Sequence, residues 1–226
     1  MTTNQEKKIR SPKYWFNYRK VLNEFVVFFG AIIISFFLIA IIIRIYGADP
    51  IKAIATIFKV SLGNEIGIAQ TINKWSPLLL GGLAFMIASR GGITNIGIDG
   101  QIYIGAIFAT GASFYFINAD TPAIFAIPLV LLLGAIGGSI YAGIAGILRA
   151  QFGINTIFTT VMCNFIAIYL TEYLTTGPWN DAMTGEAISL PIASSAHLPR
   201  LLQRGNGHIG IIIAFLIMLG THFMLE

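Results

Sequence analysis

The sequence is poor in charged residues and nearly lacks cysteine. Only 11% of its 226 residues are charged, whereas 56% are hydrophobic. A soluble domain carries roughly 25% charged residues, so this composition belongs to another class of protein. The single cysteine, Cys163, excludes a disulfide within the chain and a metal site built from cysteines.

The motifs of several catalytic classes are also missing. The chain has no glycine-rich phosphate loop with its lysine, no HExxH zinc motif, and no arrangement of nucleophile, base and acid. Its three histidines, His197, His208 and His222, lack the spacing of metal ligands. We therefore expect no catalytic residue, no metal and no cofactor.

Long uncharged runs dominate what is present. A helix that crosses about 30 Å of hydrocarbon needs about 20 largely apolar residues, and most of these runs reach or approach that length. The first run is too long for the core of a signal peptide, so we expect it to be retained. The expected fold class is an all-α, polytopic transmembrane helix bundle of about six spans, at 25–46, 69–90, 98–117, 123–148, 154–174 and 208–225.

Basic residues indicate how the chain is oriented in a membrane. The net charge of +4 is concentrated in the N-terminal segment 1–24, where it suits anionic lipid better than nucleic acid. Arg90 and Arg149 fall on the same side as that segment in a six-span arrangement. The positive-inside rule then places the N-terminus in the cytoplasm and the protein in the cell (inner or plasma) membrane.

Residues 25–226 form the expected transmembrane domain, and two of its outer segments are more than connectors. Residues 50–61 place apolar side chains on one side and lysines elsewhere, which predicts an interfacial helix on the outer leaflet. Residues 175–207 form the longest polar stretch, and a loop of that length is usually functional or disordered.

Small residues recur at four-residue spacing in the fourth predicted span. A stripe of this kind lets two helices approach closely, where lipid supplies no hydrophobic driving force. It predicts helix packing and not a function. The stripe consists of Gly134, Gly138, Ala142 and Gly146.

The hydrophobic pattern is broken between the second and third predicted spans. Asn95, Asp99 and Gln101 lie there among several glycines. One interpretation is an ordinary cytoplasmic loop, and the other is a broken, re-entrant segment that presents these side chains near a solute path or its gate. We expect a structured, buried break over 91–101, in which Asp99 either caps the next helix or contacts solute.

A second set of polar residues lies in the fifth predicted span. Thr156, Thr160 and Asn164 repeat every four residues and so share one helical face. Such a face either bonds across to neighbouring helices or lines a pathway. The candidate pathway or gate residues are Asn95, Asp99, Gln101, Thr160 and Asn164.

The stretch PLLLGGLAFMIASRGGITNIGIDGQIYIGA resembles the signature of ABC-transporter permeases for nucleosides and simple sugars, in the branched-chain amino acid/ribose-type importer family. It departs from that signature at Asp99, where glutamate is usual, and at Thr94, where an aromatic is common. FGINTIFTTVMCNFIAIYL resembles a second helix of the family, with Thr156 in place of a usual glutamate. The matching residues of the first stretch are Pro77, Gly82, Leu83, Ala84, Arg90, Gly92, Asn95, Ile96, Gly97, Gly100, Gln101 and Gly105.

The resemblance implies the permease component of an ATP-driven importer of nucleosides or simple sugars, working by alternating access. It implies three protein partners: an ATP-binding cassette subunit, a second permease subunit and an extracytoplasmic solute-binding protein. It also implies the N-terminal portion of a longer permease, because related permeases continue with further segments.

The residues alone leave other functions open. One alternative is an ion-coupled secondary transporter, which uses intramembrane acids as ion sites. Asp99 is the only internal candidate for such an acid, which disfavours this alternative. A purely structural membrane subunit is a third interpretation.

Overall fold

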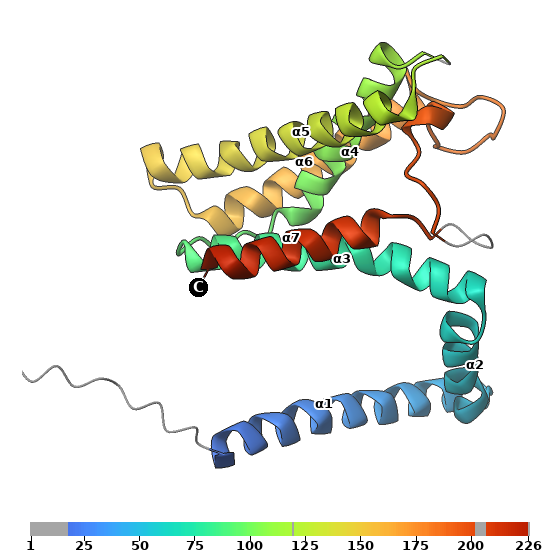
Figure 1. The fold of residues 1–226 in the computed structure, drawn as a ribbon. Coiled ribbons are helices and arrows are strands. Elements are labelled where there is room, and N and C mark those ends of the chain that lie inside the picture. The colour runs from blue at the N-terminus through green and yellow to red at the C-terminus, as the bar shows by residue number, and fades with distance from the viewer. Residues whose placement is uncertain (1–17, 119, 202–206, 226) are drawn as a thin grey trace, which may run out of the picture. The chain divides into compact units, whose positions relative to one another are not determined.

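The structure is a computed structural model that describes residues 18–118, 120–201 and 207–225. These residues form seven α-helices and one short 3-10 helix, and their only β-structure is two isolated bridges (Figure 1). The predicted all-α fold class is confirmed. The chain divides into two compact units, Met1–Val60 and Ser61–Glu226.

The first unit contains α1 (Tyr18–Ile45) and most of α2 (Pro50–Leu62). Helix α1 begins before the predicted span, and most of the predicted basic segment 1–24 lies outside the described residues. Helix α2 coincides with the helix predicted at 50–61, and the Asp49 carboxylate accepts the Ile51 amide at 3.0 Å near its start. The place of α2 on the outer leaflet stays a prediction.

The second unit contains the remaining helices, and each of the other predicted spans corresponds to one of them. Helices α5 and α6 run past their predicted C-terminal ends, and α7 begins two residues after 208. The elements are α3 (Glu65–Arg90), α4 (Ile98–Phe116), α5 (Ala123–Phe152), α6 (Thr156–Thr176), the 3-10 helix η1 (Ser194–Ala196) and α7 (Gly210–Leu225).

Among the described residues, three helices are long and apolar enough to cross a membrane: Leu22–Ile45, Ala123–Phe152 and Thr156–Thr176. Helix α7 is apolar but shorter. Helices α3 and α4 contain polar residues such as Lys74 and Asp99 and are not in this group. The number of six spans therefore stays a prediction.

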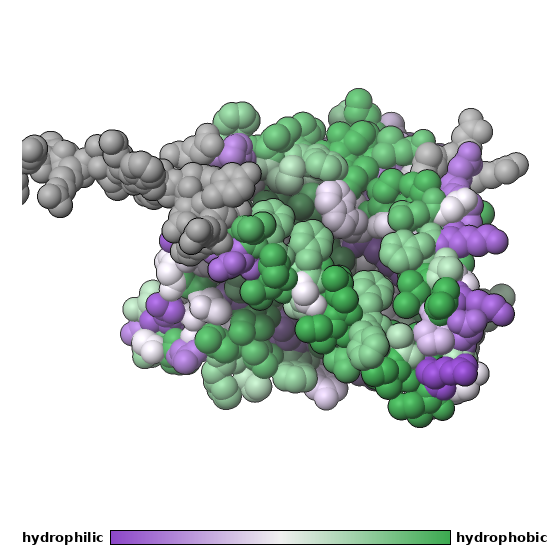
Figure 2. Space-filling view, turned by 90° about the horizontal axis from the view of Figure 1, so that it is seen from below, coloured by the Kyte–Doolittle hydropathy of each residue, from purple (hydrophilic) through white to green (hydrophobic). Residues whose placement is uncertain are grey.

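Large apolar side chains lie on the outside of the helices. Leu78, Ile124 and Phe125 are 72%, 75% and 68% exposed, and hydrophobic residues predominate on the face in Figure 2. Soluble monomers rarely expose apolar patches larger than a few hundred Å². Contact with lipid explains this surface.

The helices of the second unit form two groups. Helix α4 packs against both α5 and α6, whereas α3 packs against α7 and contacts α4 only weakly (Figure 1). The rings of Trp75 and Phe215 join α3 to α7, with centroids 5.3 Å apart. At the end of the same pair, the Arg90 guanidinium donates to the Leu225 carbonyl at 2.8 Å.

Glycines set the close approach of α4 and α5. A side-chain carbon added to Gly134 would lie 3.2 Å from the carbonyl oxygen of Gly105, and one added to Gly138 would lie 3.1 Å from that of Gln101. Both distances are shorter than ordinary van der Waals contact, so larger residues would push the backbones apart. The first half of the small-residue stripe thus faces α4.

The second half of the stripe has a different environment. Ala142 is half-buried, and a carbon added to Gly146 would meet nothing within 4 Å. Gly137 lies outside the stripe, yet a side chain there would collide with the ring of Phe108. The periodic pattern therefore identified the packed helix but only part of its contact surface.

The stretch predicted as an outer loop at 175–207 is folded over most of its length. Leu190 donates its amide to the Trp179 carbonyl at 2.8 Å, and Asp181 donates to Ile188 at 2.9 Å. These bonds form a hairpin that turns near Gly185, where φ is 68°. Residues 202–206 lie outside the described part of the chain.

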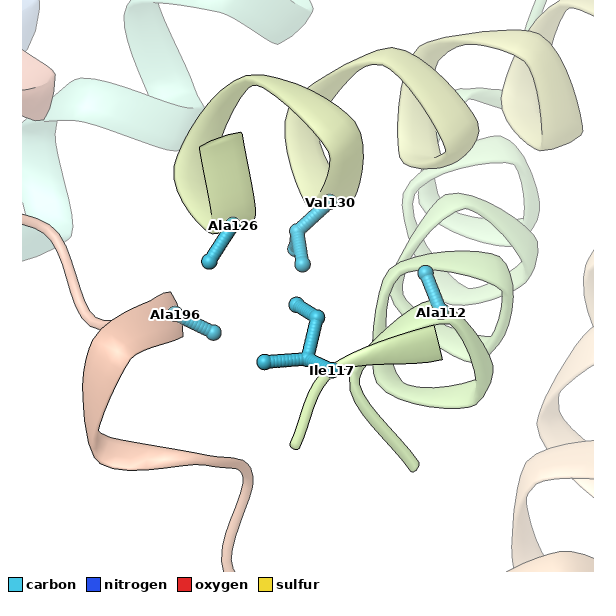
Figure 3. Packing of buried hydrophobic residues seen from close by; sticks show 5 residues of the cluster. All are labelled: Ala112, Ile117, Ala126, Val130 and Ala196. Carbon is cyan, nitrogen blue, oxygen red and sulfur yellow. The ribbon is translucent and has the colours of Figure 1, made fainter. Parts of the chain in front are cut away.

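The second half of this loop is anchored in the bundle. The buried Ser113 hydroxyl of α4 accepts the Ala193 amide at 2.9 Å. Next to it, η1 contributes Ala196 to the apolar cluster in Figure 3, between the C-terminal end of α4 and the N-terminal end of α5. The cluster consists of Ala112, Ile117, Ala126, Val130 and Ala196.

Candidate functional site

The predicted break lies between α3, which ends at Arg90, and α4, which begins at Ile98. Gly92 has a φ of 74°, a left-handed conformation that glycine adopts without steric cost. Backbone outside a helix loses its regular hydrogen-bond partners, so within a membrane bundle other groups must replace them.

Helix α6 supplies three hydrogen bonds to the break and the start of α4. The Asn164 side chain accepts the Gly100 amide at 2.8 Å and donates to the Ile96 carbonyl at 3.0 Å. The Thr160 hydroxyl accepts the Ile96 amide at 3.3 Å. The two polar residues of α6 thus bond across to the break, and neither lines the cavities described below.

Two glycines of the break make this contact sterically possible. A side-chain carbon on Gly97 would lie 2.9 Å from the Cβ of Thr160, and one on Gly100 would lie 2.8 Å from the Asn164 side-chain oxygen. Real Cβ atoms essentially never come so close. The spacing of these glycines therefore matches the path of α6, which the sequence alone did not reveal.

Asn95 and Gln101 bond to each other across the break. Asn95 donates to the Gln101 side-chain oxygen at 3.2 Å, and Gln101 donates back at the same distance. The Asn95 oxygen also accepts the Gly97 amide at 2.9 Å. The side-chain amides thus hold the turn that leads into α4.

The prediction that Asp99 caps α4 is wrong. Asp99 is exposed, and within the described part of the chain its carboxylate has no hydrogen-bond partner. The N-cap is Gly97, which offers no side-chain acceptor. Asn164 takes the buried amide of Gly100 because α6 packs directly against the start of α4. Asp99 keeps only the favourable position of an acid in the first helical turn.

Arg149 makes two contacts that the sequence pattern does not predict. At the end of α5, its guanidinium donates to the Thr156 hydroxyl at 3.2 Å and to the Gly92 carbonyl at 3.4 Å. Gly153 then ends α5 with a φ of 66°, and Asn155 caps α6 by accepting the Ile157 amide at 2.9 Å. The only feature of the sequence that points to this contact is the place of Arg149 in the last turn of a predicted helix, where the helix dipole favours a basic residue.

Two cavities lie between α3 and α4, which contact each other only weakly, and the second of them reaches the break. The first, of about 380 Å³, is lined by Gln101 together with Pro77 and Gly81. The second, of about 370 Å³, is lined by Asn95 and Asp99 beside an apolar wall that includes Phe85. Ligand pockets typically measure about 300–1,000 Å³ and combine apolar walls with a few polar groups. These two cavities have that character.

Comparison with known proteins places the chain in a family. The profile of the family described as "Branched-chain amino acid transport system / permease component" matches residues 67–226, which is most of the chain. The chain belongs to this permease family. Family membership and the long apolar helices agree that this permease chain is embedded in a membrane.

Individual relatives are permeases of nucleoside and sugar transporters. The guanosine ABC transporter permease of Bacillus subtilis is 29% identical over 92% of this chain and 59% of its own length. The nucleoside ABC transporter permease of Lactococcus lactis is 35% identical over 69% of this chain and 41% of its own length. The glucose ABC transporter permease of Haloferax volcanii is 29% identical, with coverages of 78% and 48%. The permease chain thus spans about half the length of these relatives, and no solved structure matches it.

Proposed function

We propose that this permease chain forms part of the translocation pathway of an ATP-driven importer for nucleosides or simple sugars. The observation that carries the proposal is the pair of cavities between α3 and α4, which Asn95, Asp99 and Gln101 line. The names of the relatives supply the class of solute.

The cavity walls suit uncharged, hydroxyl-rich solutes. Such a solute loses hydrogen bonds to water when it enters the bundle, and the protein must replace them. The exposed Asp99 carboxylate accepts from hydroxyls, and the paired amides of Asn95 and Gln101 both donate and accept. Phe85 and Pro77 face the apolar side of a sugar ring or a base.

The energy for transport comes from partner subunits in this proposal. The chain has no glycine-rich phosphate loop, so an ATP-binding cassette subunit hydrolyses ATP. A second permease subunit completes the pathway, and an extracytoplasmic solute-binding protein delivers solute to the folded loop that contains Trp179. This arrangement needs the N-terminus in the cytoplasm.

Uptake by intact cells tests the proposal. Deletion of the gene is expected to reduce uptake of labelled guanosine, uridine, ribose or glucose to background, and a plasmid copy restores it. Because ATP drives the step, arsenate is expected to abolish uptake, whereas a protonophore applied with ATP maintained leaves most of it. The inverse inhibitor pattern would instead assign an ion-coupled secondary transporter.

Cysteine labelling tests the orientation. In a Cys163→Ala background, a cysteine at Met183, which is 95% exposed, is expected to react with an impermeant maleimide added outside the cell. A cysteine placed within 5–10 reacts only after the cells are permeabilised. The opposite pattern would place the N-terminus outside and reverse the direction of the pathway.

A further inference from the structure

A small cavity lies at the end of α4 and α6 opposite the break. It measures about 130 Å³, below the range of about 300–1,000 Å³ that holds drug-sized ligands, yet it is large enough for several waters. No lining residue carries a charge. The lining residues are Tyr103, Ala106, Ile107, Thr110, Thr171, Leu174, Thr175, Trp179 and Ser189.

The polar groups of this cavity divide into two sets. Thr171 and Thr175 donate their hydroxyls to helix carbonyls, at 2.8 Å and 3.2 Å. The second set makes no hydrogen bond with the described part of the chain: the hydroxyls of Tyr103, Thr110 and Ser189 and the indole N–H of Trp179. These four groups can therefore form hydrogen bonds with a ligand or with water.

Trp179 is held in place rather than free to swing. Its indole meets the ring of Phe114 edge to face, with centroids 5.4 Å apart, and lies 3.7 Å from where a carbon on Gly111 would stand. Its backbone donates to the Leu174 carbonyl at 2.9 Å and accepts from Leu190 at 2.8 Å. The hairpin therefore presents a fixed aromatic surface to the cavity.

We propose that this cavity is a binding subsite for one sugar ring, either a free sugar or the ribose of a nucleoside. Three hydroxyls that donate and accept, together with one N–H donor, match a ring that carries several hydroxyls. The aromatic rings of Tyr103 and Trp179 offer apolar surface to its C–H groups. No lining residue is charged, so the cavity offers no ion pair to a charged ligand. The subsite rests on the proposed function, and it lies between α4 and α6, whereas the two cavities described above lie between α3 and α4.

Trp179 itself reports on binding. In the purified full chain in phosphatidylcholine nanodiscs, Trp15→Phe and Trp75→Phe leave Trp179 as the only tryptophan. Titration with D-ribose, D-glucose or uridine is expected to change its emission saturably, whereas glycine betaine at equal osmolality has no effect. Responses to ribose and uridine identify a ribosyl subsite, and a response to glucose alone identifies a hexose subsite. Calorimetry on the unsubstituted chain repeats the titration in case these substitutions impair folding.

Thr110→Val tests the role of the hydroxyls at nearly constant side-chain volume. We expect it to raise the dissociation constant about 5-fold to 10-fold, the loss of roughly one hydrogen bond. The matched control is Thr221→Val on α7, which removes a hydroxyl that donates to Met218 at 2.8 Å and does not line this cavity. That control is expected to bind as the parent does.

Absence of saturable binding, or equal binding by the Thr110→Val chain, would overturn the subsite. The uptake experiment tests the importer separately, because it measures energised transport in cells and not binding to the purified chain. Sugar binding without ATP-dependent uptake would keep the subsite and remove the importer, and uptake without sugar binding would do the reverse.

Discussion

Replacing Asn164 with leucine is expected to lower the free energy of unfolding by about 2–4 kcal/mol, since an unsatisfied buried polar group costs about 1–3 kcal/mol. The substitution removes the acceptor of the buried Gly100 amide and the donor to the Ile96 carbonyl. The Ile96 carbonyl is more exposed and can bond to water in the variant. The expected loss is therefore smaller than the cost of two fully buried groups. Leucine also branches toward Gly100, where the Asn164 backbone already approaches closely. Denaturant titration in detergent, followed by circular dichroism, measures the change.

Two further variants separate the causes. Asn164→Asp keeps the oxygen acceptor and loses the amide donor, so it is expected to fall between the parent and the leucine variant. Asp99→Asn changes an exposed side chain without a hydrogen-bond partner in the described residues, so it is expected to lose only the helix-dipole contribution, at most about 1 kcal/mol. If Asn164→Leu unfolds at the parent's denaturant concentration, α6 does not hold the break.

Replacing Gly138 with leucine is expected to separate α4 from α5. Its first side-chain carbon would lie 3.1 Å from the Gln101 carbonyl oxygen and 4.0 Å from the Gly105 Cα, so backbone and not a flexible side chain must move. Overpacking typically costs about 1–3 kcal/mol, and contact with backbone places this variant at or above the upper end. A lower melting temperature and reduced yield of folded protein in detergent would record the effect.

Gly146→Leu is the matched control for this prediction. It makes the same substitution in the same helix and on the same stripe, but a carbon there meets nothing within 4 Å. We expect its melting temperature to stay near that of the parent. Equal losses in the two variants would show that leucine disturbs α5 itself, and equal stability would show that Gly138 does not face another helix.

The extent of the helices could be predicted from the sequence because hydrophobic run length is a local property. The apolar runs and the lysine spacing of 50–61 predicted both ends of α2 to α7 to within four residues, but for α1 only the end, because α1 begins seven residues before the predicted 25. The folding of 175–207 could not be predicted in this way. Its hairpin and the docking of Ala196 depend on partners far away in the chain, and its composition alone resembles that of a flexible loop.

The candidate site, too, could be predicted from the sequence only in part. Glycines and polar residues predict a structured, buried break, and a polar helical face predicts that Thr160 and Asn164 act together. The break is structured, but within 91–101 only Gly97 and Gly100 are buried. The common partner of the two α6 side chains, Ile96, could not be predicted, because it lies 64 residues from Thr160 and 68 residues from Asn164. The place of Asp99 at the start of the predicted span makes it the expected cap, whereas in the structure the distant Asn164 accepts the Gly100 amide.

Two arginine side chains bond the start of the break to different helices. The Arg90 guanidinium is hydrogen-bonded to the end of α7. The carbonyl of Gly92, two residues later, is hydrogen-bonded to Arg149 at the end of α5. Gly91 and Gly92 thus lie between a contact to α7 and a contact to α5, so a rotation of the α3–α7 pair relative to α4, α5 and α6 would change the torsion angles of these two glycines.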